Sequence, residues 1–314
     1  MSSVVFDPIH ESKRNMLVAG WGWALGGVLL VAVAGLSLRE EVAQDAQPEH
    51  PVSPWALVWR DEFDGQVLDA TKWAVRAPGL RESAMISAEN VSLDGAGRLL
   101  LTTTEKDGVI HTGMIGSQGK FSHTYGRWEA RIKFHAMEGH HGSFWLQPER
   151  REKDVGNNPH LTGAEIDIIE WFGAGRKDGG AASNVYWPGE AGQHLHDGGP
   201  LDLTPVLKDG RNLSDDFHVY AVEWTPDEYV FFIDEHEVFR TRAGVSRQPQ
   251  YAILSLLCAD WEAPRLDRSR LPESMMVDYV RVYRMRTAAV AVGPSPRAGA
   301  PSPVANSRYI TSRE

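Results

Sequence analysis

Alternation of hydrophobic and polar residues predicts β-strands through the middle of the chain. The segment 127–134 (RWEARIKF) has aromatic and aliphatic residues at one parity and charged residues at the other. Successive side chains of a strand point to opposite faces, so this pattern predicts a strand with one buried face. The segment 275–284 (MMVDYVRVYR) is β-branched, aromatic and alternating in the same way.

Two longer segments have the pattern of strands joined by turns. Residues 90–104 (NVSLDGAGRLLLTTT) are two strand-like runs around a turn that contains Asp94 and Gly95. Residues 217–241 give three strand candidates, with turns at 225–227 and 234–237. Helix signals are few, with one turn expected near 69–73. Many closely spaced strands with little helix predict an all-β sandwich or barrel.

The two ends of the chain differ in composition from this strand-rich body. We expect residues 1–38 to be a short cytoplasmic stub followed by a signal peptide or a membrane anchor, and residues 39–54 to be a linker. Residues 287–314 are rich in Ala, Pro, Ser and Gly, and we expect a disordered tail there. One domain is then expected over residues 55–286.

The apolar run from Met16 to Leu38 is long enough to cross a bilayer as a helix. Lys13 and Arg14 precede it, so the positive-inside rule places the N-terminus in the cytoplasm. The small residues at 32–34 (AVA) also offer a signal-peptidase site. A cleaved export signal and a retained single-pass anchor both stay open, and either one places the domain outside the cytoplasm.

Composition and charge narrow the choice of partners. The chain has 314 residues with 32 basic and 42 acidic side chains, a formal net charge of −10, which argues against nucleic acid as the main partner. The single cysteine, Cys258, excludes an intrachain disulfide and a cysteine-clustered zinc site. Eleven tryptophans suit a β protein with an aromatic-lined surface. We expect a monomer.

Three acidic residues interrupt the strand pattern in the stretch 163–173 (GAEIDIIEWFG). On a regular strand Glu165 and Asp167 share one face, and Glu170 points the other way. On a helix Glu165 and Glu170 would lie about 140° apart. A β-bulge inserts one residue and resets the alternation. We therefore predict a bulge between Asp167 and Glu170 that brings the three carboxylates to one face.

The chemistry of such a cluster has more than one interpretation. Crowded carboxylates repel, so at least one of them should hold its proton more tightly. Glycoside hydrolysis needs this division, with one ionised carboxylate and one protonated acid flanking the scissile bond. A metal site and a solvated strand edge are the alternatives. Calcium would favour oxygen ligands on a loop, whereas Ile166, Ile168 and Ile169 indicate a half-buried strand.

The stretch EIDIIE resembles the E-x-D-x-x-E signature of glycoside hydrolase family 16, in its bulged, laminarinase-like form. Five further segments resemble the family's in the expected order. They are VWRDEFDGQVLDATKW, NVSLDGAGRLLLTT, YGRWEARIKF with GSFWLQP, FHVYAVEWTPDEYVFFID and VDYVRVYR. The resemblance extends from about Trp55 to Arg284, which is essentially the whole expected domain.

This resemblance implies a jelly-roll sandwich of two curved antiparallel sheets with a concave substrate cleft. It also implies retaining hydrolysis of internal β-glycosidic bonds in a polysaccharide, with no required cofactor. Carried over by position, Glu165 would be the nucleophile, and Glu170 would be the general acid and then the base. Asp167 would hold a shared proton or hydrogen bond and tune both carboxyls.

Other residues are candidates for binding the polysaccharide. Aromatic faces suit the apolar face of a sugar ring, so Trp145 and Trp171 are candidate stacking platforms, with a place in the core as the alternative. Glu129 and Arg131 lie on the polar face of their strand and are candidates for substrate contact. A solvated face is the alternative for these two residues.

Departures from the family pattern bear on the substrate. The laminarinase-like run WPAFW is replaced by HHGSFW, so an expected tryptophan is missing. Asn184 and Trp187 stand near the place where relatives often have a histidine beside the acids, with His194 and His196 further on. A β-1,3- or β-1,3/1,4-glucan is the first expectation for the substrate, and a galactan stays open.

By the same resemblance, Glu62, Gly97 and Asp278 would hold one structural calcium ion on the convex side. Asp278 lies in an apolar strand and needs some partner. The leading hypothesis is an exported retaining endo-β-glycanase. A transglycosylase that remodels wall polymer and a non-catalytic carbohydrate-binding protein are the alternatives.

Overall fold

The computed structural model describes residues 53–150, 156–190 and 193–286. The predictions for residues 1–38, for nearly all of the linker and for the tail at 287–314 lie outside the described residues, and so does the apolar run from Met16 to Leu38. Among the described residues, no helix has the length and the apolar character needed to cross a membrane.

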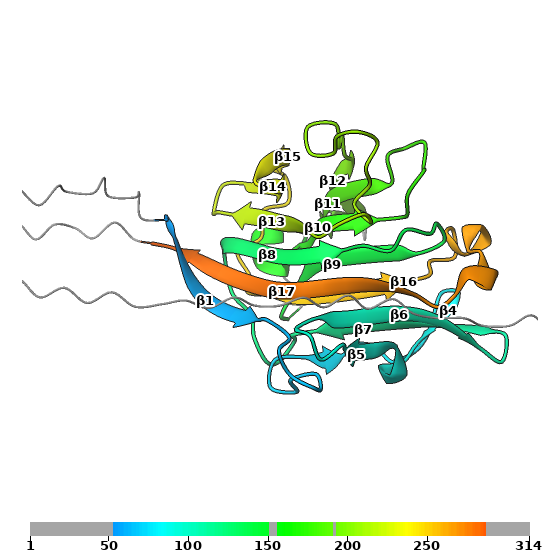
Figure 1. Cartoon of the computed structure of the whole chain (residues 1–314). Helices are drawn as coiled ribbons and strands as arrows, with labels where there is room; N and C mark the ends of the chain where they lie inside the picture. The colour runs from blue at the N-terminus through cyan, green and yellow to red at the C-terminus, as the bar shows by residue number, and fades with distance from the viewer. Residues whose placement is uncertain (1–52, 151–155, 191–192, 287–314) are drawn as a thin grey trace, which may run out of the picture. The chain divides into compact units, whose positions relative to one another are not determined.

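The strands form two packed sheets, which we name sheet A and sheet B. Figure 1 views the molecule from the side of sheet A, with β8, β17 and β6 in front. Sheet A consists of β1 (Trp55–Asp61), β5 (Val91–Leu93), β6 (Leu99–Lys106), β8 (Gly126–Lys133), β13 (His218–Trp224), β14 (Tyr229–Ile233), β15 (His236–Thr241) and β17 (Glu273–Met285). Their order is β5–β6–β17–β8–β13–β14–β15, and β1 pairs with the C-terminal part of β17.

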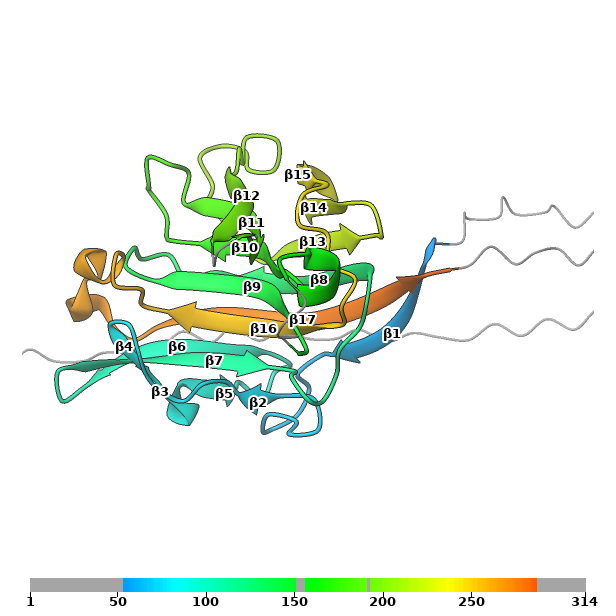
Figure 2. The same ribbon diagram turned by 180° about the vertical axis from the view of Figure 1, so that it is seen from behind.

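Sheet B lies behind sheet A and is in front in Figure 2, where β9, β16 and β7 cross the view. It consists of β2 (Ala74–Val75), β7 (Val109–Gly116), β16 (Gln250–Leu257), β9 (His141–Pro148), β10 (Glu165–Trp171), β11 (Ala181–Pro188) and β12 (His194–Pro200), in that order. A short hairpin of β3 (Gly79–Arg81) and β4 (Ala84–Ile86) runs alongside β7. The ends of β6 and β7 pair with each other and join the two sheets along one edge.

Alternation along each strand divides its residues between the core and the outside, as the sequence predicted. The main core lies between the sheets and includes Trp128 and Ile132 from sheet A and Phe144 and Ile166 from sheet B, all fully buried. Residues of opposite parity on sheet B form a second, smaller cluster on its other face, which includes Trp145 and Ile253. Sheet B is therefore covered on one face and carries a partly open surface on the other.

The predicted strands at 90–104, 127–134, 217–241 and 275–284 are all present. The expected turn near 69–73 is a hydrogen-bonded turn, in which the amides of Lys72 and Trp73 both donate to the Asp69 carbonyl. Within the described residues, the α-helix is α1 (Pro159–Thr162), and 3-10 turns lie at Ala88–Asn90, Ala263–Arg265 and Arg268–Arg270. The all-β jelly-roll prediction is confirmed.

His135 is a buried histidine next to Gly142 of β9, and its two ring nitrogens have no hydrogen-bond partner within the described residues. Burial, and then the charges of His140 and His141, lower the pKa of His135 well below its ordinary value of 6.5. The folded protein therefore keeps this imidazole neutral at a pH where the unfolded chain already protonates it.

Because the unfolded state then binds more protons, the free energy of unfolding should fall as the pH drops below about 6.5. The proton that His135 takes up on unfolding changes the free energy of unfolding by up to about 1.4 kcal/mol per pH unit. The free energy of unfolding can be measured with urea at several pH values between about 7.5 and about 5.5. Its decrease with falling pH should be smaller for His135→Asn than for the wild type. His194→Asn, at an exposed position, should keep the wild-type slope. Equal slopes for His135→Asn and the wild type would contradict this prediction.

Candidate active site

A sharp turn after α1 places the acidic strand β10. Gly163 ends the helix with φ of 79°, a conformation that favours glycine. An added Cβ at Gly163 would lie 2.5 Å from the Cβ of Pro148, the last residue of β9. The chain therefore turns tightly against the end of β9 and enters β10 at Glu165.

The predicted bulge lies where the sequence placed it. In the pairing of β10 with β11, the register shifts between Asp167 and Glu170. In the pairing with β9, Asp167 lies opposite Trp145 and Ile169 opposite Phe144, so Ile168 is the inserted residue. Its carbonyl accepts a hydrogen bond of 2.8 Å from the Ser183 hydroxyl. The three isoleucines of the strand are all buried in the main core.

The bulge brings the three acids to the same hollow on the open face of sheet B. This hollow has a volume of about 260 Å³ and is lined by side chains from both sides of β10. They are Arg81, Glu82, His141, Ser143, Trp145, Glu165, Asp167, Glu170, Tyr186, Ser255, Leu257, Ala259 and Trp261. We name it the acid hollow.

Glu165 is half-buried and is held by an amide from the neighbouring strand. Nε2 of Gln147 donates to Glu165 Oε2 at 2.5 Å. The oxygen of the same amide accepts from Arg76 Nη2 at 2.7 Å, and the Tyr251 hydroxyl lies 3.3 Å from it. A buried amide donor of this kind fixes the orientation of the carboxylate.

Glu170 has different partners from Glu165. Nε2 of His141 lies 2.8 Å from Glu170 Oε1, and Asn184 Nδ2 donates to Oε2 at 2.7 Å. An imidazole nitrogen can either donate or accept this hydrogen bond, depending on the tautomer of His141. The two glutamates of the cluster therefore lie in chemically distinct surroundings.

Asp167 is buried between the two glutamates, with 5 % of its surface exposed. Burial, and then the charges of Glu170 and Glu165, raise the pKa of Asp167 well above its ordinary value. Asp167 is therefore the carboxyl that holds its proton more tightly. Burial, and then the charges of Glu170, Asp167 and Glu165, raise the pKa of the neighbouring Tyr186 to about 12.

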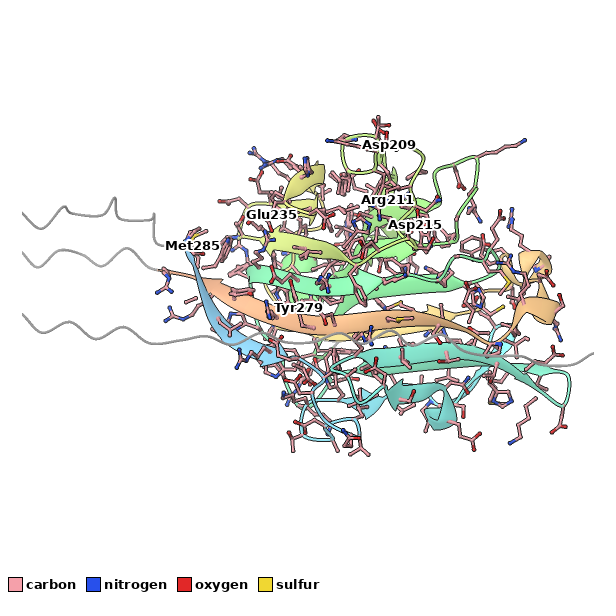
Figure 3. The ribbon with its side chains drawn as sticks, in the orientation of Figure 1. Asp209, Arg211, Asp215, Glu235, Tyr279 and Met285 are labelled. Carbon is pink, nitrogen blue, oxygen red and sulfur yellow. The ribbon has the colours of Figure 1, made fainter. Side chains whose placement is uncertain are left out.

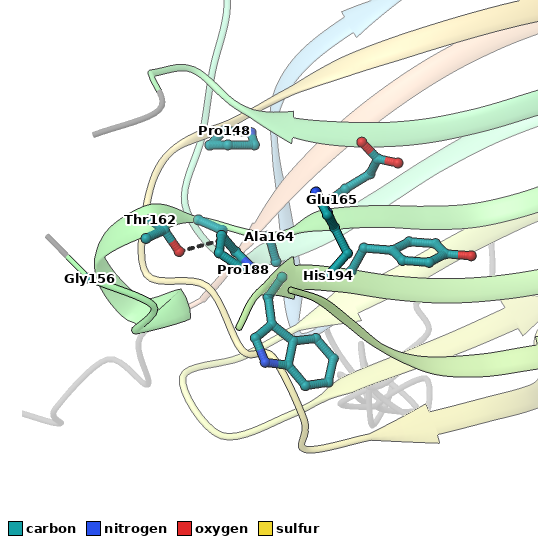
Figure 4. Close-up of a pocket in the computed structure, with 10 residues that line it drawn as sticks. Pro148, Gly156, Thr162, Ala164, Glu165, Pro188 and His194 are labelled. Atoms are coloured by element: carbon teal, nitrogen blue, oxygen red, sulfur yellow. Dashed lines mark hydrogen bonds between the residues drawn. The ribbon is translucent and has the colours of Figure 1, made fainter. Parts of the chain in front are cut away.

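A second hollow of about 510 Å³ continues from the acid hollow at Glu165 and Tyr186, which line both. Figure 4 shows Glu165 at its side, with Pro148, Thr162 and His194 around it. The acids therefore lie inside an extended groove, with space on both sides, rather than at a closed end.

The aromatic ring most open to a ligand in the acid hollow is Trp261, which is 53 % exposed. It packs edge-on against Phe172, with ring centroids 5.1 Å apart. The hairpin of β3 and β4 supports this region, since the Ser83 hydroxyl donates to Asp260 at 2.7 Å. Trp145, the predicted platform, lines the same hollow but is only 6 % exposed, and Arg76 lies over its ring at 5.4 Å.

The prediction of Trp171 as a stacking platform is wrong. Trp171 is 1 % exposed and belongs to the main core, where its indole nitrogen donates to the His135 carbonyl at 2.8 Å. It follows Glu170 directly on β10, so it points to the opposite face of the sheet. The bulge that turns Glu170 toward the acid hollow is therefore the reason that Trp171 is buried.

The prediction that Glu129 and Arg131 contact substrate is also wrong. Both lie on the outer face of sheet A, whose side chains Figure 3 shows from the front, with Tyr279 labelled on β17. Glu129 accepts from Arg127 at 3.0 Å, and Arg131 donates to Asp278 at 2.9 Å. These polar side chains face away from sheet B and form ion pairs with one another on the outer face of sheet A, where Glu129 is buried.

The residues predicted for calcium do not fit a calcium ion held by side chains. Arg281 binds both carboxylate oxygens of Glu62, at 2.9 and 2.8 Å, and lowers the pKa of Glu62, while Asp278 is paired with Arg131. Gly97 offers no side chain. Within the described ranges, no three His, Cys, Asp or Glu residues are grouped so that they could hold a metal.

The remaining predicted residues lie at or near the groove. Asn184 contacts Glu170 directly, and Trp187 lines the second hollow from the edge of the main core. His194 lines that hollow too, and His196 stacks on Tyr186 with ring centroids 5.4 Å apart. The histidine that contacts the acids is a different one, His141.

Sequence reasoning missed His141, Gln147, Tyr186 and Trp261. Two of these could have been found, because His141 and Gln147 share the parity of Trp145 on β9 and therefore share its face. His141 lies in the run HHGSFW, the segment that departs from the family pattern. Trp261 lies in a loop, where no periodic signal exists.

Comparison with known proteins gives a consistent result. The sequence model described as Glycosyl hydrolases family 16 matches residues 81–281. A beta-glucanase of Rhodothermus marinus is 29 % identical over 286 residues, covering 82 % of this chain and 93 % of that protein. A keratan-sulfate endo-1,4-beta-galactosidase of Sphingobacterium multivorum is 28 % identical over 250 residues, covering 74 % of this chain but only 56 % of that protein.

Among solved structures, the endo-beta-1,3-glucanase of Pyrococcus furiosus superposes with a TM-score of 0.61 at 24 % identity. The match covers 74 % of this chain and 95 % of that one. At this level of identity the likeness concerns the fold, and it supports the jelly-roll assignment.

Proposed function

The chain belongs to glycosyl hydrolases family 16, and on that premise we propose that it is a retaining endo-β-glycanase that cleaves internal bonds of a polysaccharide. The observation that carries the proposal is the bulged strand β10, which turns Glu165, Asp167 and Glu170 into one hollow. Retaining glycosidases need two carboxyls of different character on one face, and these glutamates have different partners.

In the proposed mechanism Glu165 attacks the anomeric carbon while Glu170 gives a proton to the departing oxygen. A covalent glycosyl ester then forms on Glu165. Glu170, now ionised, takes a proton from water, and this water releases the sugar with its original configuration. Burial, and then the charges of Glu170 and Glu165, raise the pKa of Asp167 well above its ordinary value, and a protonated Asp167 would donate a hydrogen bond between the two glutamates.

We propose a β-1,3- or β-1,3/1,4-glucan as the first substrate to test, because the Rhodothermus marinus relative is named a beta-glucanase. The named activity of the Sphingobacterium multivorum relative keeps a galactan as the second choice. The extended groove on both sides of Glu165 supports cleavage within a chain rather than at its end.

The proposal also includes export through the apolar run from Met16 to Leu38, as a cleaved signal or a retained anchor, and a monomeric catalytic domain over residues 55–286. The support for export is the length and the flanking charge of that run.

The direct test is a panel of polysaccharides with sizing of the products and determination of the anomer released. The proposed function predicts early release of several oligosaccharide lengths and a β-anomer as the first product. An α-anomer as the first product would contradict the retaining route. Binding without any release of reducing ends would favour a carbohydrate-binding protein, and products longer than the starting oligosaccharide would favour a transglycosylase.

Trp261→Ala should raise KM on the polysaccharide about three- to tenfold with little change in kcat. The exposed indole offers a stacking face to a sugar, and an aromatic contact of this kind contributes about 0.5–1.5 kcal/mol. Met285→Ala is a suitable control, since this exposed side chain lies at the end of β17 (Figure 3) and does not line the acid hollow. If KM is unchanged in Trp261→Ala, the stacking role is wrong.

A further inference from the structure

Gln147 is the direct contact between the acid Glu165 and Arg76, a cation that directly follows β2. It lies on β9 next to β10, is 9 % exposed, and donates through Nε2 to Glu165 at 2.5 Å. Its amide oxygen accepts from the guanidinium of Arg76 at 2.7 Å. The chain therefore contains a continuous series of hydrogen bonds from Arg76 through Gln147 to Glu165.

This series determines which way the amide points. Arg76 has only donors, so the atom of the Gln147 amide that faces Arg76 must be the oxygen. The amide nitrogen must then face Glu165. Tyr251 strengthens this orientation, because its hydroxyl lies 3.3 Å from the amide oxygen and accepts from Arg76 Nε at 3.1 Å.

The position of Arg76 is itself well determined. Its guanidinium lies over the rings of Trp145 and Tyr251, at 5.4 and 5.9 Å from their centroids. Its backbone amide donates to the Met114 carbonyl of β7 at 2.9 Å. A cation held in this way polarises the amide and strengthens the hydrogen bond that the amide gives to the carboxylate.

We propose that Gln147, oriented by Arg76 and Tyr251, is the positioning residue of the nucleophile. It holds one carboxylate oxygen of Glu165, so that the other is aimed at the sugar. This inference rests on the proposed function, since it requires Glu165 to be the nucleophile. Gln147 acts through Glu165 and needs no contact with the substrate.

Gln147→Met tests the proposal, because methionine has similar length and volume but no donor. We expect kcat to fall about tenfold to a hundredfold, with KM changed less than about threefold. The acidic limb of the pH profile of kcat/KM should move to higher pH by about one unit, because the ionised form of the nucleophile loses its donor.

Two further variants keep the test decisive if Gln147→Met does not fold. Tyr251→Phe removes one hydroxyl and keeps the ring, and it should move the acidic limb in the same direction by a smaller amount. Arg76→Met should lower kcat in the wild-type background but have little effect in the Gln147→Met background, because Arg76 acts through the amide. Gln118→Met is the matched control, since the exposed Gln118 amide donates to the backbone carbonyl of Glu149 and does not line the acid hollow.

Other titratable and charged groups also face Glu165, and none of them is altered in these variants. They are Asp167 and Glu170 on β10, His141 on β9, Tyr186 on β11, His194 on β12, Arg81 at the end of β3 and Glu82 in the turn that follows it. A shift of the acidic limb in the variants can therefore be assigned to the altered contact.

The outcomes separate this inference from the proposed function. If Gln147→Met folds and keeps wild-type kcat with an unmoved acidic limb, the inference is wrong, even where Glu165→Ala is inactive. A rise in KM alone would also overturn it, because Gln147 would then be a substrate-binding residue. If Glu165→Ala retains full turnover, the proposed function is wrong and the inference is wrong with it.

Discussion

Glu165→Ala is expected to lower kcat by roughly ten-thousandfold or more, because the covalent intermediate can no longer form. The alanine leaves space beside the anomeric carbon, so azide should restore turnover of a substrate with a good leaving group. The product should be a glycosyl azide of inverted configuration, since azide attacks from the side of the missing carboxylate. Nuclear magnetic resonance of the reaction over time measures the rate at which the glycosyl azide forms and identifies its anomeric configuration.

The fold should tolerate this change. Glu165 is one of three crowded acids, so its removal relieves repulsion, and the thermal midpoint should be equal to or above that of the wild type. Glu89→Ala is the control for loss of an acid, because the Glu89 side chain is 78 % exposed and remote from the acid hollow. A folded Glu165→Ala protein with wild-type turnover would remove the nucleophile from the mechanism.

Glu170→Ala should have the second largest effect, and its size should depend on the leaving group. With a polysaccharide, kcat should fall about a hundredfold to ten-thousandfold, because proton donation to the departing oxygen is lost. With an activated aryl glycoside the first step needs no acid, so the glycosyl-enzyme should accumulate. Azide should then release a glycosyl azide of retained configuration, the opposite outcome to Glu165→Ala.

This contrast tests the assignment of roles and not only the presence of a site. His141 and Asn184 contact Glu170, whereas Gln147 contacts Glu165. If both variants gave the same azide anomer, the two glutamates would not have the separate roles proposed here. Burst kinetics with the aryl glycoside provide a second measurement, since a burst is expected for Glu170→Ala and not for Glu165→Ala.

The arginine pairs on the outer face of sheet A illustrate the limit of reasoning from relatives. The sequence resemblance gave Glu62 and Asp278 a shared cation, but each carboxylate has an arginine partner in the structure. A match to a sequence motif predicts which strand or loop a residue belongs to. It does not predict which neighbour neutralises its charge, because that neighbour comes from another part of the sequence.

Local patterns were sufficient for the fold class, the acidic strand and its bulge. The period of two along a strand is a local property, so Ile166, Asp167 and Glu170 could be assigned to faces from the sequence alone. The same parity also implied that Trp171 points away from the acids once the bulge is accepted. Trp171 is the neighbour of Glu170 in the sequence, but the two side chains lie on opposite faces of the strand.

Only the tertiary structure decided which strands lie beside β10 and which face of each sheet is open. The polar parity of Glu129 is indistinguishable in sequence from that of a cleft-facing residue, but sheet A turns it outward. Gln147 and His141 reach the acids because β9 pairs with β10, and Trp261 does so because a loop after β16 returns to the acid hollow. Strand pairing and loop placement depend on contacts between residues far apart in the chain, which local periodicity does not encode.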